Sequence, residues 1–406
     1  MSETPKLRRS LSLTHIVLYG LGVTIGAGIY ALLGEVVGKA GLLTPVAFTL
    51  ALALVSFTAL SFAEMVDRFP KSAGPAIYVH KGLNSKTLGI IVGLLVVASA
   101  IVSSAALVNG FLGYVLEFVE IPRTVAIVGL VCVLGLIVAW GIDESVGAAG
   151  LITAVEIFGL ILVIGSGWQG FETLPSRWRE FVPTADMGAW TGIFAGTLLA
   201  FYAFLGFEDI VSVAEEATDA HRILPLGIIL TLVFTLVLYV GVSLAAVTNV
   251  PLDMLSTSQA PLAMIVEHTG AMPSGVISAI GMFAIINGAL IQIIMASRIL
   301  YGMSSMGWVP EFLARVHPTT QTPLIATALI VGGVLVLALG FRIAPLAEMT
   351  SMIALTVFSL VNLSLISLKW REPSPEGVRT YPLWVPIAGF IASAVFLLQE
   401  VLRRLS

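Results

Sequence analysis

Residues 22–30 read GVTIGAGIY and place three glycines within seven residues of a long apolar run, residues 13–37. Glycine in a helix interior costs about 1 kcal/mol relative to alanine, so this helix is weakest around Ile25 to Gly28. Unwinding there frees backbone N–H and C=O groups, which a membrane tolerates only where they are buried in protein or line a water-filled cavity. The stretch therefore predicts a broken membrane helix whose backbone faces an internal site.

A second interrupted stretch lies five apolar runs later. Residues 201–209 read FYAFLGFED and place Gly206 and two acidic residues inside the run 191–214. A pair of interrupted spans in corresponding positions of two halves is the best sequence pointer to a transporter site. Close helix packing also explains glycines in a single membrane helix. The five-span offset favours the transporter, because an inverted repeat of five plus five spans requires it.

Such a pair of breaks suits a solute that carries one positive and one negative group. The half-helix after a break presents its positive N-terminal end to a carboxylate. The half-helix before a break offers unpaired carbonyl groups to an ammonium group. One break in each repeat therefore gives both ends of an amino acid a partner near the membrane midplane.

The composition is that of a membrane protein. Of the 406 residues, 58% are hydrophobic and 11% are charged, whereas a soluble domain is about 45–50% apolar and about 25% charged. About 20 apolar residues cross the roughly 30 Å hydrocarbon core of a bilayer. We therefore expect an all-α membrane protein of about 11 transmembrane helices, at residues 13–37, 42–63, 88–116, 124–140, 146–164, 191–214, 223–247, 273–297, 323–340, 345–368 and 383–399.

We interpret residues 1–406 as a single transmembrane domain, with repeat one at roughly 11–168, repeat two at roughly 189–370 and an extra C-terminal helix at roughly 383–400. The connections are short and contain no phosphate-binding loop, which argues against an ATP-driven pump. The single cysteine, Cys132, excludes a disulfide framework. The spans contain no nucleophile–base pair and no metal-ligand cluster, so we expect no enzyme, cofactor, metal or nucleic-acid partner.

Positive charges set the orientation. With the N-terminus in the cytoplasm, 13 of the 20 Lys and Arg residues fall on the cytoplasmic side and 7 on the outer side. The positive-inside rule therefore favours a cytoplasmic N-terminus in a multi-pass protein of the cell membrane. Arg403 and Arg404 run against this bias, because eleven spans place them outside.

Two carboxylates inside the spans are candidates for proton coupling. Glu156 lies in the middle of the run 146–164, where a charge is costly and usually marks function. A carboxyl there favours its neutral form and is able to take up a proton on one side and release it on the other. Alternatively, Glu156 stays protonated and hydrogen-bonded, or faces a watery vestibule. Glu208, just after the second break, is a candidate proton sensor, a contact for a cationic substrate or a brace between half-helices.

Other polar residues have structural interpretations. Glu64, near the end of the second run, is expected to pair with Arg68, Arg222 or Arg298. Asn109, Asn287 and Gln292 are expected to link helices rather than to line a cavity.

Four groups of motifs resemble the amino acid–polyamine–organocation superfamily. They are IGAGIY at 25–30; FAEM at 62–65 with FPKSAGPAIY at 69–78; GFE at 206–208 with AEE at 214–216 and Leu224-Pro225; and SRILYGM at 297–303 with GWVP at 307–310. The resemblance covers most of the chain. The motifs are specific for the family and uninformative about the substrate.

The resemblance implies a LeuT-type fold with inverted repeats and broken helices one and six. It implies that the backbone around Gly28 receives a substrate carboxylate, that carbonyl groups of both breaks receive the amine, and that Tyr202 lies over the solute as a gate. The substrate-binding residues implied are Thr24, Ile25, Gly26, Ala27, Gly28, Tyr202, Ala203, Phe204, Leu205 and Gly206. Most members have twelve spans, and this chain departs from them with eleven.

These observations predict a secondary active transporter that imports amino acids by alternating access, coupled to protons. An amino acid, amine or polyamine exchanger without ion coupling is the alternative, and a non-transporting scaffold or sensor is a third. The lipid bilayer, an amino acid and a proton are the partners expected. The oligomeric state stays open.

Overall fold

The computed structural model of the chain describes residues 11–70, 74–116, 118–140, 146–317, 320 and 322–405. Within these ranges every regular element is a helix, and the only β-type pairing is an isolated bridge between Leu11 and Ala217. The expectation of an all-α membrane protein is confirmed. Lys6, Arg8 and Arg9, which contribute to the predicted orientation, lie outside the described residues.

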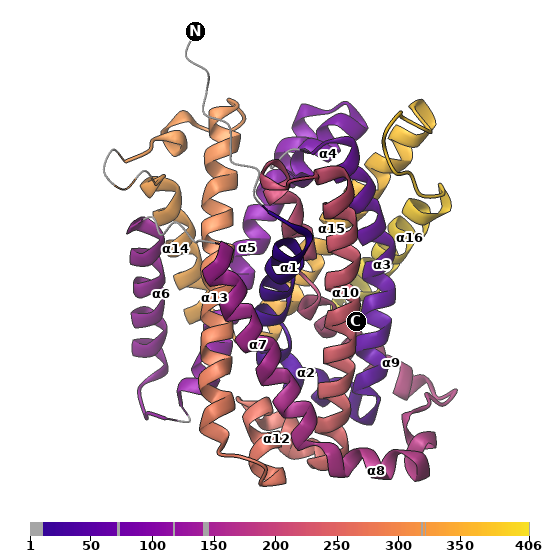
Figure 1. Cartoon of the computed structure of the whole chain (residues 1–406). Coiled ribbons are helices and arrows are strands. Elements are labelled where there is room, and N and C mark those ends of the chain that lie inside the picture. Colours follow the sequence, from indigo (N-terminus) through magenta and orange to yellow (C-terminus); the bar gives the residue numbers. More distant parts are fainter. Residues whose placement is uncertain are drawn as a thin grey trace.

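The structure contains sixteen described α-helices and four short 3-10 helices (Figure 1). In chain order they are α1 (Leu13–Ala27), α2 (Ile29–Ala40), η1 (Gly41–Leu43), α3 (Thr44–Arg68), α4 (Gly74–Leu83), α5 (Lys86–Val115), α6 (Arg123–Trp140), α7 (Val146–Ser166), α8 (Trp168–Arg177), η2 (Trp178–Phe181), α9 (Met187–Ala203), η3 (Phe207–Glu216), α10 (Ala220–Asn249), α11 (Leu252–Thr257), α12 (Pro261–Thr269), α13 (Ser274–Ser305), η4 (Glu311–Ala314), α14 (Leu324–Gly340), α15 (Ile343–Arg371) and α16 (Trp384–Leu405).

Eight described helices are long and apolar enough to cross a membrane, and a ninth is added if the bent pair Gly150–Ser166 and Trp168–Phe181 is one span. Two more apolar helices, Leu13–Gly26 and Leu324–Gly340, are shorter. One of the eight, Ile29–Arg68, has 40 residues, so as a single straight helix it would be about 60 Å long, twice the bilayer core. All eleven predicted runs lie on these helices, and the number of spans itself stays a prediction.

The long helices form one bundle in which α1 is surrounded by others (Figure 1). It packs against α7, α10 and α13, while α5 packs against α13 and α15. α4 marks one end of the bundle, and α8 and α12 mark the opposite end (Figure 1); these are called the α4 end and the α12 end below. α6 and α16 lie at the periphery and bury only 22% and 28% of their apolar windows, so most of their surface is available to lipid.

Candidate functional site

The first interrupted stretch is a break between two helices. α1 ends at Ala27, α2 begins at Ile29, and Gly28 between them has φ −102° and ψ −81°, outside the helical region. The Gly28 carbonyl accepts a hydrogen bond from the Leu32 amide at 3.1 Å and so begins the new helix. The break lies within the predicted segment, because three glycines lower the helix propensity there.

The second interrupted stretch is a sharper turn. α9 ends at Ala203, and the amides of Phe204 and Leu205 turn back to the carbonyl groups of Phe201 and Tyr202 at 3.0 Å. Gly206 follows with φ +122°, a conformation that L-amino acids rarely adopt, and the chain continues as the 3-10 helix η3.

The two breaks contact each other in the centre of the bundle. A Cβ atom on Gly28 would lie 2.6 Å from the Ala203 Cα atom, and one on Gly206 would lie 3.0 Å from the Thr24 amide nitrogen. The Tyr239 hydroxyl lies 2.9 Å from the carbonyl oxygens of both Thr24 and Ala203. The ten predicted substrate-binding residues therefore gather in one place, where backbone is packed on backbone.

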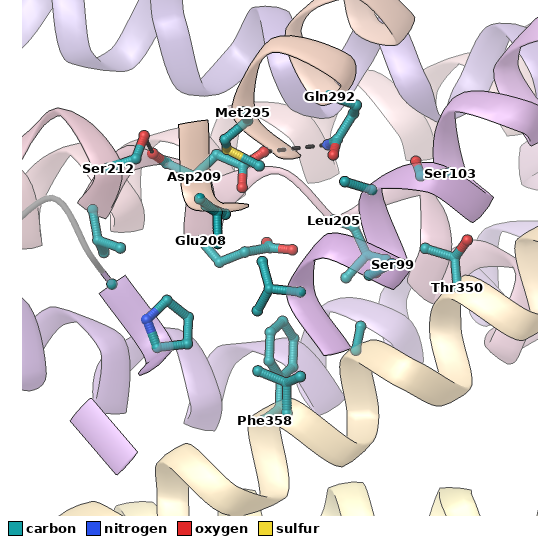
Figure 2. Close-up of a pocket in the computed structure, with 18 of the residues that line it drawn as sticks. Ser99, Ser103, Leu205, Glu208, Asp209, Ser212, Gln292, Met295, Thr350 and Phe358 are labelled. Atoms are coloured by element: carbon teal, nitrogen blue, oxygen red, sulfur yellow. Dashed lines mark hydrogen bonds between the residues drawn. The ribbon is translucent and has the colours of Figure 1, made fainter. Parts of the chain in front are cut away.

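A cavity lies beside the second break, on the side of the α4 end (Figure 2). It contains about 720 Å³ of empty space, part of it open to solvent. The described residues that line it come from six elements and are Phe62, Gly74, Pro75, Val96, Ser99, Ala100, Ser103, Leu205, Glu208, Asp209, Val211, Ser212, Gln292, Met295, Ile299, Thr350, Ala354, Val357 and Phe358, with Leu205 preceding η3.

The lining follows helical periodicity. Ser99 and Ser103 are one turn apart on α5, and Gln292, Met295 and Ile299 share a face of α13. η3 has three residues per turn, so Asp209 and Ser212 lie on the same face. The wall residues of α5, α13 and α15 thus each follow one helical stripe, while η3 presents two adjacent faces.

Two of the predicted functional residues line the cavity, Leu205 and Glu208. The residues of the first break, Thr24 to Gly28, do not line it. The Tyr202 ring is buried, but its hydroxyl is 3.0 Å from Oγ of Ser103, a residue of the cavity wall. In this conformation the second break borders the cavity, whereas Ala203 covers the first break.

Sequence reasoning missed several residues of the wall. Asp209 is 6% exposed, and its Oδ2 atom accepts a hydrogen bond from Nε2 of Gln292 at 3.3 Å (Figure 2). Gln292 does link two elements, as expected of an interhelical residue, but it lines the cavity as well. The available signal was the second acidic residue directly after Glu208 in an apolar run. Ser99, Ser103 and Thr350 carry no such signal.

Glu156 lies on the other side of the first break, away from the cavity. Its side chain is buried at 1% exposure, and Oε1 accepts a long 3.4 Å hydrogen bond from Asn287 of α13. Oε2 has no hydrogen-bond partner among the described residues. A Cβ atom on Gly26 would be 3.7 Å from Oε1, so the carboxyl faces the backbone of the broken helix. Asn287 links helices here, and so does Asn109, which donates to Ala338 of α14.

A cluster of charged residues lies at the α4 end of the bundle. Glu64 pairs with Arg68 at 2.8 Å, as predicted, and also with Lys369 of α15 at 2.7 Å. Asp67 contacts His221 at the start of α10 and accepts from the Arg379 amide. These contacts connect α3, α10 and the segment between α15 and α16.

A family model described as amino acid permease matches residues 11–401. A vacuolar cationic amino acid transporter 4 of Arabidopsis thaliana is 29% identical over 91% of this chain and 64% of its own length. A branched-chain amino acid permease of Bacillus subtilis is 26% identical over 92% of this chain and 83% of its own length. A methylthioribose transporter of the same bacterium is 25% identical over 98% and 88%.

The chain spans less than two thirds of the length of two plant cationic amino acid transporters that it matches, 64% and 62%. The relatives differ in the solutes that their names state. The family match runs from residue 11 to residue 401 and so spans the part of this chain that contains both helix breaks and the cavity wall. This chain is an integral multi-pass membrane protein that belongs to the amino acid permease family of the amino acid–polyamine–organocation superfamily.

Proposed function

We propose that this protein is a secondary active transporter that imports amino acids by alternating access. The observation that carries the proposal is the position of the cavity next to two helix breaks that touch each other. A solute in the cavity lies beside the second break, and separation of Gly28 from Ala203 would give it access to the first. Half-helix ends at both breaks then have groups for a carboxylate and an ammonium.

The proposed substrate site is therefore the set of ten residues of the two breaks, Thr24 to Gly28 and Tyr202 to Gly206. In this account the amides after Ala27 receive the substrate carboxylate, and the carbonyl groups of Thr24 and Ala203 receive the amine. Tyr239 holds both carbonyl oxygens in the described conformation, so its hydroxyl is displaced when an amine binds.

We propose that import is coupled to protons through Glu156, with Glu208 as the second titrating group. The support is the carboxyl of Glu156, which is buried and faces the first break through Oε1, while Oε2 has no hydrogen-bond partner among the described residues. A buried carboxylate without a cation is costly, which favours its protonated form, and movement of the first break changes its surroundings. Exchange without ion coupling is the alternative, in which Glu156 stays neutral and structural.

The test compares Glu156→Gln with wild type in proteoliposomes that contain labelled amino acids on one or both sides. The amide mimics a permanently protonated carboxyl, so net uptake driven by an inward proton gradient should fall at least tenfold while exchange continues. Glu267→Gln, at an exposed carboxylate of α12, is the matched control and should behave as wild type. Retention of gradient-driven accumulation by Glu156→Gln would remove Glu156 from the coupling mechanism.

We also propose that the two halves, residues 11–168 and 189–370, are inverted repeats. The proposed membrane is the cell membrane, with the N-terminus and the α4 end in the cytoplasm. The excess of Lys and Arg on that side supports this orientation. The cavity then opens towards the cytoplasm in the described conformation.

A further inference from the structure

We propose that Asp209, together with Glu208 and Gln292, binds a cationic group of the solute other than the one held at the helix breaks, either a primary ammonium or a guanidinium. The preferred solutes are then those with net positive charge. This inference rests on the proposed function of the same cavity and names the class of solute that it takes.

The described charged side chains that line the cavity are acidic. Glu208 and Asp209 are the charged side chains among the described lining residues, and no Lys, Arg or His occurs among them. Arg298, one turn beyond Met295 on α13, is exposed and does not line the cavity. A carboxylate that stays ionised in a buried site needs a compensating cation. A solute with net positive charge supplies one, whereas a neutral amino acid adds a carboxylate for every ammonium that it brings.

Hydrogen bonds of the backbone fix the position of Asp209 beside the cavity. Its amide donates to the Gly206 carbonyl at 3.0 Å, and its own carbonyl accepts from the Ser212 hydroxyl at 2.6 Å, so its backbone is fixed from both sides. The side chain is 6% exposed and yet belongs to the cavity wall. The small exposed part therefore faces the cavity and not the lipid.

Each carboxylate accepts a hydrogen bond from a neutral donor among the described residues. Oδ2 of Asp209 accepts from Gln292 at 3.3 Å, and Oε2 of Glu208 accepts from the Gly206 amide at 2.9 Å. These neutral donors orient the two groups without neutralising their charge. An ammonium has three N–H donors and a guanidinium has five, enough to bridge both carboxylates.

The remaining wall suits the rest of such a solute. Met295, Ile299 and Phe358 give the wall apolar contacts for a methylene chain. Figure 2 shows the hydroxyl groups of Ser99, Ser103 and Thr350 away from the acidic pair. Long cationic side chains commonly place their methylene stem on apolar surface and their charge on polar groups.

The experiment measures competition between solutes in proteoliposomes of wild type, Asp209→Asn and Asp253→Asn. Asp253 is an exposed residue of α11 at the α12 end and provides the same chemical change outside the cavity. Unlabelled lysine, arginine, leucine and a four-carbon diamine compete with labelled lysine and labelled leucine. Thermal unfolding of each purified protein with and without lysine or leucine measures binding independently of transport.

We expect wild type to prefer lysine and arginine to leucine. Asp209→Asn should raise the inhibition constant of lysine by roughly 10- to 100-fold, as loss of a charge-assisted hydrogen bond predicts. The inhibition constant of leucine should change by less than about threefold. Lysine should raise the melting temperature of wild type and of Asp253→Asn, but not that of Asp209→Asn. Competition by the diamine would show that the cation alone is recognised, and failure of the diamine would show that the carboxylate is needed as well.

Two results would overturn the inference. One is a wild-type protein that transports leucine and is neither inhibited nor stabilised by lysine. The other is an Asp209→Asn variant that loses lysine and leucine equally, which would make Asp209 structural. Failure of the proposed function would give a different result, because no amino acid would then accumulate under any gradient. The effect of lysine on the melting temperature would still test binding at Asp209.

Discussion

Gly28 leaves no room for a side chain between the two helix breaks. A Cβ atom there would lie 2.6 Å from Cα and 2.7 Å from the carbonyl oxygen of Ala203, and backbone atoms do not move aside easily. Gly28→Ala should therefore lower the melting temperature of the purified protein by several degrees and strongly reduce uptake. Gly129→Ala, in α6, is the control, because nothing lies within 4 Å of the added atom.

The comparison of these two variants isolates the contact. If Gly28→Ala and Gly129→Ala unfold at the same temperature and transport equally well, the close approach of the breaks is not part of the working structure. Replacement by a larger residue such as leucine is less informative, since loss of uptake would combine a filled site with a displaced helix.

At the scale of single residues, local sequence identified the breaks better than the cavity. The glycines at 22, 26 and 28 predicted unwinding because helix propensity is a local property. Asp209, Ser99 and Thr350 come from three separate helices, and only the packing of those helices brings them to one wall. Glu156 was recognised because a carboxyl in an apolar run is conspicuous, but its distance from the cavity depends on how α7 packs.

At the scale of the element, the turn between α9 and η3 depends on the left-handed conformation of Gly206. Its φ of +122° is strained for any other residue, and an added Cβ would also meet Val23 and the Thr24 amide. Gly307 has φ +66° with open space around it, so Gly307→Ala reports the backbone cost alone, about 1–2 kcal/mol.

We therefore expect Gly206→Ala to lower the melting temperature clearly more than Gly307→Ala, and to impair transport as well. The excess measures the contact between the second break and α1 together with the greater backbone strain at φ +122°. Equal destabilisation by the two substitutions would mean that this contact contributes nothing beyond the conformation of the turn.

The course of the long elements was largely predictable, because runs of about 20 apolar residues in a membrane protein form helices whatever their neighbours are. All eleven predicted runs lie on helices. The short helices α4, α8 and α11 were not predicted as elements of their own. They lie at the ends of the bundle, where composition is mixed and the hydrophobic signal is weak.

At the scale of the whole molecule, the cavity and the α12 end should be accessible from opposite sides of the membrane. Ser212 lines the cavity, and Thr257 is exposed at the end of α11. Each is replaced by cysteine in a Cys132→Ser background. With the proposed orientation, an impermeant thiol reagent should label Ser212→Cys in inside-out vesicles and Thr257→Cys in right-side-out vesicles. Labelling of both from one side would contradict the orientation or the conformation described.

Coupling between the cavity and Glu156 also belongs to the whole molecule. α13 carries Asn287, which donates to Glu156, and Gln292, which donates to Asp209. One helix thus contacts both the proposed proton site and the cavity wall. A shift of α13 on solute binding would change both hydrogen bonds together.

Uptake of labelled amino acids into proteoliposomes, with and without an inward proton gradient and with empty or preloaded vesicles, tests the central claim most directly. The account predicts accumulation in empty vesicles that requires the proton gradient. Uptake only into preloaded vesicles, unaffected by the gradient, would contradict proton-coupled import and would identify the protein as an exchanger.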